Sequence, residues 1–112
     1  MKVRRAMLYD FYGELLTEHQ KEIYESFVLE DLALVEIAEL HGISRQGVHE
    51  LVKRCDRILT DYEDKLHLVE KFEKTKALVN QINSYTKQYK KSHDDICIDK
   101  ILEISDEILD NM

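Results

Sequence analysis

Apolar residues recur at intervals of three and four along most of the chain, which is the spacing of amphipathic helices. The pattern predicts a short helix over residues 6–16 and a second over residues 17–30, where Thr17 and Gln20 have the spacing of a capping box. A third helix is predicted over residues 34–40, and Asp31 is a candidate N-cap if that helix begins earlier. Because no strand-like alternation is found, the chain is predicted to be all-α.

Residues 34–54 have the spacing of a helix-turn-helix unit. Ala38 stands where two helices would cross closely, and Gly42 stands where the turn requires a positive φ, which glycine adopts at little cost. Ile43 is placed to fill the turn, and the Ser44 hydroxyl is placed to cap the next helix. The buried side of that next helix is predicted to consist of Val48, Leu51 and Val52.

The helix after the turn is predicted to be long, because its apolar positions continue at helical spacing from Val48 to Phe72, about seven turns. These positions are Leu51, Cys55, Ile58, Tyr62, Leu66, Val69 and Phe72. A four-helix head cannot cover so long a stripe, and apolar stripes of this length are not left in water. We therefore predict a homodimer formed by the C-terminal segment and the distal part of this helix, with Leu66, Val69 and Phe72 in the interface.

Two more helices are predicted after this one. The first contains Ala77 and follows a break near Thr75, and the last is capped by Asp94 or Asp95. The predicted fold is thus an all-α helix-turn-helix head with a long fourth helix and a C-terminal helical extension. We place the head at residues 1–62 and the extension, continuous with it, at residues 63–112.

The net charge of −7 argues against a simple DNA-binding protein, because neutralising phosphates requires clustered Lys or Arg. Basic residues nevertheless gather in residues 2–5, 45–57 and 71–91, whereas the last segment is acidic. Contact with DNA or RNA, which the sequence does not distinguish, would therefore be local, weak and salt-sensitive. The residues predicted to make this contact, from the outward side of the helix after the turn, are Arg45, Gln46, His49, Lys53 and Arg54.

The sequence favours no other chemistry. Cys55 and Cys97 lack the spacing of zinc ligands and are predicted to be reduced core thiols, and the five histidines are scattered. Because no nucleophile motif or glycine-rich phosphate loop is present, neither an enzymatic activity nor a metal or cofactor is predicted. No signal peptide and no apolar run of about 20 residues is visible, so a soluble cytoplasmic protein without membrane contact is expected.

Three segments together resemble a known family. They are DFYGELLTEHQ at residues 10–20, EIAELHGISRQGV at residues 36–48 and DYEDKLHLVEKF at residues 61–72, and they closely resemble the YlxM family of small bacterial helix-turn-helix proteins. The resemblance implies a head similar to region 4 of sigma factors. Because the family's genes commonly neighbour those of the signal recognition particle GTPase and its receptor, it also implies a regulator associated with that particle's protein and RNA.

Two classes of function follow from the residues and the resemblance. In the first, the protein is a nucleic-acid-binding accessory factor of the signal recognition particle pathway. In the second, it is a protein interaction module that regulates the particle's GTPase without contacting nucleic acid, and its acidic helices dock on a basic partner surface.

Overall fold

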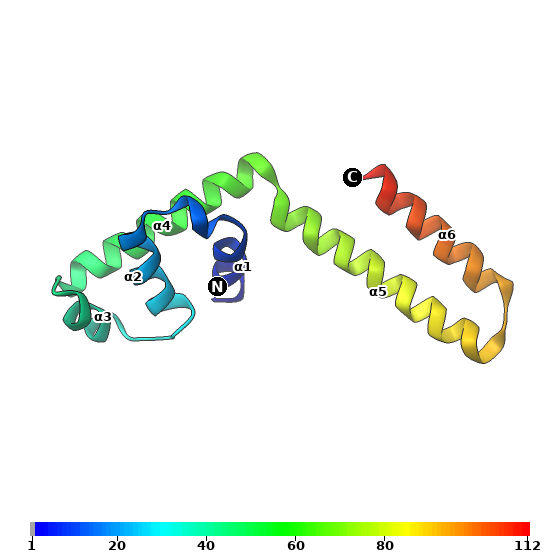
Figure 1. The fold of residues 1–112 in the computed structure, drawn as a ribbon, viewed down its shortest axis with the longest axis horizontal. Helices are drawn as coiled ribbons and strands as arrows, with labels where there is room; N and C mark the ends of the chain where they lie inside the picture. Colours follow the sequence, from blue (N-terminus) through cyan, green and yellow to red (C-terminus); the bar gives the residue numbers. More distant parts are fainter. Residues whose placement is uncertain (1) are drawn as a thin grey trace. The chain divides into compact units, whose positions relative to one another are not determined.

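The computed structural model describes residues 2–112, and for Lys2 it describes the backbone alone. Figure 1 shows α1 (Lys2–Tyr12), a 3₁₀ turn (Gly13–Leu15), α2 (Glu18–Val28), α3 (Leu34–His41), α4 (Arg45–Leu66), α5 (Leu68–Ser92) and α6 (Asp95–Asp110). The residues described contain no strand, which confirms the all-α prediction. They form two compact units, a head that ends at Val69 and a hairpin that begins at Glu70.

Helix α4 is the centre of the head, and α1, α2 and α3 all pack against it (Figure 1). The core between these helices is built from aliphatic side chains and two tyrosines, Tyr12 and Tyr24, which are almost fully buried. Burial of each large apolar side chain stabilises the head by roughly 1.5–3 kcal/mol. The aliphatic residues of this core include Leu8, Ile23, Ile37, Val48, Val52, Leu59 and Val69.

Local signals set several helix ends as predicted. The Thr17 hydroxyl accepts a hydrogen bond from the Gln20 N–H at 3.2 Å, and the Gln20 side chain accepts one from the Thr17 N–H at 2.9 Å, so the capping box of α2 is confirmed. Asp94 caps α6 by accepting from the Ile96 N–H at 3.0 Å. Helix α3 does not begin early enough for Asp31 to cap it; the Glu36 carboxylate instead accepts from the Ala33 N–H at 3.0 Å.

The predicted continuity of one helix from Val48 to Phe72 is wrong. Helix α4 ends at Leu66, and His67 adopts the left-handed conformation with φ 55°. The next helix then runs without interruption through Thr75, where the sequence had predicted a break. The break therefore falls about two turns earlier than predicted.

A buried polar cluster explains the position of this break. Glu63 is only 5% exposed, and its carboxylate accepts hydrogen bonds from the Tyr12 hydroxyl and from the Val69 N–H, the latter at 3.0 Å. The Tyr12 hydroxyl in turn accepts from the Leu68 N–H at 3.1 Å. The first N–H groups of a helix have no partner within the helix. Here Tyr12 and Glu63 accept the hydrogen bonds of two such groups, the N–H groups of Leu68 and Val69. We call this cluster of Tyr12, Glu63, Leu68 and Val69 the joint.

The joint also corrects one residue of the predicted dimer interface. Val69 is 1% exposed and belongs to the core of the head, so the premise that it lacks a partner there is wrong. A side chain buried to this extent offers no surface to a second chain. Leu66 and Phe72, by contrast, are each nearly half exposed.

In the hairpin, α6 returns alongside α5 (Figure 1), and the Cys97 thiol lies 3.9 Å from the side-chain oxygen of Gln88. Leu78, Cys97 and Ile104 are the buried residues of this unit. Both cysteines of the chain are buried and free, as predicted. Among the described residues, no helix is long and apolar enough to cross a membrane.

Candidate nucleic-acid interface

The turn between α3 and α4 has the geometry that the sequence predicts. Gly42 ends α3 with φ 65°, and the Ile43 N–H donates to the Ala38 carbonyl at 3.1 Å. The Ser44 hydroxyl then caps α4 by accepting from the Gly47 N–H at 2.9 Å. These contacts confirm the helix-turn-helix unit and fix the direction in which the first turns of α4 leave it.

One side of α4 is core and the other is solvent. Val48, Val52 and Cys55 are buried against the other head helices. The four side chains of Arg45, Gln46, His49 and Lys53 are exposed. Because successive residues of a helix are rotated by about 100°, these four fall within an arc of roughly 100° that begins beside the buried Val52 and turns away from the core. We call this set the α4 face.

The first half of the α4 face borders a shallow depression. Arg45, Gln46 and His49 line it together with Leu34, which is the first residue of α3. The depression thus combines a guanidinium, an amide and an imidazole with one aliphatic side chain. Such groups can reach phosphates and base edges together.

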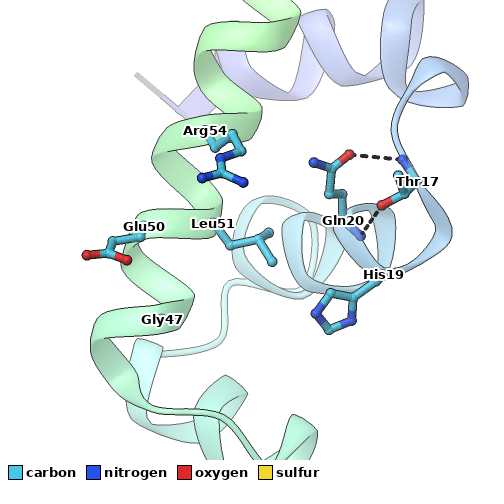
Figure 2. Close-up of a pocket in the computed structure, with 7 residues that line it drawn as sticks. All are labelled: Thr17, His19, Gln20, Gly47, Glu50, Leu51 and Arg54. Atoms are coloured by element: carbon cyan, nitrogen blue, oxygen red, sulfur yellow. Dashed lines mark hydrogen bonds between the residues drawn. The ribbon is translucent and has the colours of Figure 1, made fainter.

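Arg54, the fifth predicted contact residue, is not part of this face. It lies about half a turn of the helix away from Arg45 and borders a different groove, between α4 and the start of α2. Figure 2 shows this groove, with Leu51 extending from α4 toward α2 and Glu50 projecting to the other side. The remaining lining residues are Thr17, His19, Gln20 and Gly47.

Glu50 is a neighbour of the α4 face that the sequence interpretation overlooked. It lies one turn after Gln46, and its carboxylate accepts a hydrogen bond from the Gln46 amide at 3.3 Å. The signal was present in the sequence as an i, i+4 pair of a glutamine and an acid. The consequence is a negative charge beside the basic residues, which lowers the attraction of this face for phosphate.

The basic patch predicted at residues 2–5 is partly neutralised. Arg5 forms a two-pronged ion pair with Asp56, with nitrogen to oxygen distances of 2.9 and 3.2 Å, and its guanidinium lies 5.4 Å from the centre of the Phe27 ring. The Tyr24 hydroxyl donates to the same carboxylate at 2.6 Å. Arg5 is therefore a structural residue that ties α1 to α4. The Lys2 side chain lies outside the described part of the structure.

The groups with shifted pKa values lie away from the α4 face. Burial raises the pKa of the Cys55 thiol to about 11, and the nearby Asp56 carboxylate adds to this effect. Burial also raises the pKa of Tyr24 and Tyr9, as do their hydrogen bonds to Asp56 and Glu25. Among the residues described, no cluster of His, Cys, Asp or Glu could hold a metal ion.

Comparison with known proteins agrees with this geometry. Residues 1–99 match the model of the family UPF0122, described as "Putative helix-turn-helix protein, YlxM / p13 like". The chain is 44% identical over 79 residues to a UPF0122 protein of Symbiobacterium thermophilum, covering 70% of this chain and 74% of the relative. It is 42% identical over 95 residues to a UPF0122 protein of Clostridium botulinum, covering 84% and 87% of the two chains. A third relative, from Geobacillus, is 40% identical over 104 residues, which cover 93% and 94%.

Proposed function

We propose, because this chain belongs to the UPF0122 family of YlxM / p13 like helix-turn-helix proteins, that it is a regulatory protein that binds nucleic acid through the α4 face. The observation that carries this proposal is the exposure of Arg45, Gln46, His49 and Lys53 on the first turns of a helix whose adjoining side is core. Helix-turn-helix proteins read DNA from this part of their second helix.

Electrostatics favour a local and weak contact. The positive end of α4 lies at Arg45, where the helix dipole adds to the charge of the guanidinium. Glu50 and the net charge of −7 act in the opposite direction. We therefore propose that binding is strongly salt-dependent and becomes effective when the protein is part of a larger complex.

The resemblance to the YlxM family implies what that complex is. We propose that the protein acts as an accessory factor of the signal recognition particle, with the particle's protein and RNA as its partners. The acidity of the chain supports a second candidate, in which the protein regulates the particle's GTPase by protein contact alone.

The test is a binding titration of the double variant Arg45→Ala and Lys53→Ala against labelled duplex DNA and against the particle's RNA. Both side chains are exposed, so we expect the free energy of unfolding to change by less than about 0.5 kcal/mol. Affinity should fall, and the dependence of the binding constant on salt should become less steep, because two phosphate contacts are lost.

Lys100→Ala is the control, because it removes one charge from an exposed position of the acidic helix α6. It should leave affinity and salt dependence unchanged. If the double variant binds as the wild type does, and the protein alters the particle's GTPase equally well with and without its RNA, the nucleic-acid proposal is wrong and the protein-contact candidate stands.

A further inference from the structure

The hairpin has too little core for an independent folded unit. Only the side chains of Leu78, Cys97 and Ile104 are buried between the two helices of residues 70–112, and Ile82, Ile101 and Ile108 beside them are half-buried. Folded units of about 40 residues usually need a disulfide, a metal or a partner chain for stability. Cys97 is a free thiol, so no disulfide supplies this stability.

Large apolar side chains are meanwhile exposed on the hairpin. Val79 on α5 is 49% exposed, and Ile98, Leu102 and Leu109 on α6 are 45%, 61% and 65% exposed. Val79 follows the buried Leu78 by one residue, and Ile98 follows the buried Cys97 by one residue, so each is rotated by about 100° from the contact between the helices. Leu102 and Leu109 are rotated from that contact by a similar angle, about 120–140°.

These four side chains lie on one face of the hairpin. Because α5 and α6 are antiparallel, rotations of the same sense along the two chains point to the same side of the pair. The opposite side carries Gln81 and Gln88 on α5 and Glu103 and Glu107 on α6, by the same geometry. The first side also carries Asn83 and Thr86 on α5, and the opposite side carries the exposed Ile96, but the first side holds more of the exposed large apolar side chains. We call the set of Val79, Ile98, Leu102 and Leu109 the apolar face.

The charged residues on the outer flanks of the hairpin indicate which partner covers the apolar face. Beyond it, the outer flank of α5 carries Lys76 and Lys87, whereas the outer flank of α6 carries Asp95, Asp99 and Asp110. The contact between Gln88 and Cys97 sets the register, so that Lys87 lies level with Asp99 and Lys76 with Asp110, while Lys90, on the side of the apolar face, lies level with Asp95. A surface with this pattern is complementary to a copy of itself.

We propose that the hairpin pairs with the hairpin of a second copy of the chain to form an antiparallel four-helix bundle whose two-fold axis runs along the helices. This axis places α5 of each copy on α6 of the other, so that the lysine flank meets the aspartate flank and the two apolar faces enclose one core. A two-fold axis across the helices would instead oppose lysines to lysines. The two α5 helices then run in the same direction, so their N-terminal ends lie at the same end of the bundle.

The experiment is sedimentation of the full chain at concentrations down to the micromolar range. We expect a dimer at roughly tens of micromolar, where interfaces of standard size are occupied. Leu102→Glu should weaken the dimer at least tenfold, because it places a charge in the shared core. Ile96→Glu is the matched control, since Ile96 lies on the same helix and is 62% exposed but falls outside the apolar face. It should leave the dimer unchanged.

A charge exchange tests the direction of the axis. Lys87→Asp and Asp99→Lys should each weaken the dimer, and the two together should restore it, because the proposed pairing opposes these positions. A monomeric wild type at tens of micromolar, or a loss of dimer in Ile96→Glu equal to that in Leu102→Glu, would overturn the bundle. A double exchange that fails to restore the dimer would overturn the proposed axis.

Discussion

Glu50 is the residue that most limits the proposed binding face. We predict that Glu50→Gln tightens binding to duplex DNA or to RNA by roughly 1.4- to fivefold, because removing an exposed charge beside phosphate contacts is worth about 0.2–1 kcal/mol. The substitution also weakens the hydrogen bond between the Gln46 amide and the side chain of residue 50. The amide then becomes available to a base edge. Fluorescence anisotropy titrations at two salt concentrations measure the effect.

The control is Glu103→Gln, which changes the net charge equally but lies in the hairpin. If both variants tighten binding to the same extent, total charge rather than the α4 face governs affinity. If Glu50→Gln does not raise the affinity for nucleic acid, the contact lies elsewhere on the head.

Cys55 should make the head sensitive to alkaline pH. Its pKa is raised from 9.0 to about 11 in the fold, so the unfolded chain loses this proton at lower pH than the folded chain does. The stability contributed by the neutral thiol is therefore full below pH 9 and is lost as the pH rises toward 11. We expect the free energy of unfolding in urea to fall over this range.

The pKa values of Tyr9 and Tyr24 are also raised from 10.0, so they steepen the fall once the pH exceeds 10. The pKa of Tyr12 is raised in the same way, and all three tyrosines begin to contribute between pH 9 and pH 10, so the thiol is isolated by comparing the wild type with Cys55→Ala in this window. Cys55→Ala should be less stable at every pH but flatter in this window. A wild type and a Cys55→Ala variant with the same slope there would contradict the assignment.

At the scale of the helices, the joint between α4 and α5 is predicted to be a point of high sensitivity. Tyr12→Phe removes a hydroxyl that donates to Glu63 and accepts from the Leu68 N–H, and it leaves both groups short of one partner. We expect a loss of about 1–3 kcal/mol in the free energy of unfolding, which is the usual cost of unsatisfied buried polar groups.

Tyr62→Phe is the matched control. Its ring is stacked on that of Tyr12 with a distance of 6.0 Å between ring centres, and it loses the same atom at a half-buried position. Chemical denaturation of both variants should show a clearly smaller loss for Tyr62→Phe. Equal losses would mean that the hydrogen bonds of the joint contribute little.

The joint also explains why the end of α4 was not predicted from the sequence. A left-handed residue is normally glycine or asparagine, and His67 carries no such signal. Its conformation coincides with contacts between residues more than 50 positions apart, such as Tyr12 and Glu63. From the sequence alone, Glu63 would likewise be interpreted as a solvent-exposed acid of an amphipathic helix. By contrast, the Thr17, Ser44 and Asp94 caps involve residues within three positions and were predictable.

At the scale of the whole molecule, the class of fold and the order of the helices were predictable because each depends on local periodicity. The grouping of the proposed binding residues was predictable only in part. Helical geometry unites Arg45, Gln46, His49 and Lys53, whereas the place of Arg54 beside α2 depends on how two helices pack. The ion pair between Arg5 and Asp56 likewise joins residues that are 51 positions apart, and no local sequence pattern predicts it.

The joint has a further consequence for hydrogen exchange. Amide protons in the first turn of a helix normally exchange quickly with solvent, because nothing in the helix accepts their hydrogen bonds. Here the Leu68 and Val69 amides donate to Tyr12 and Glu63 of the head. Their exchange is therefore governed by opening of the head rather than by fraying of α5, and these two protons mark the point where the protection of one unit extends into the first turn of the next helix.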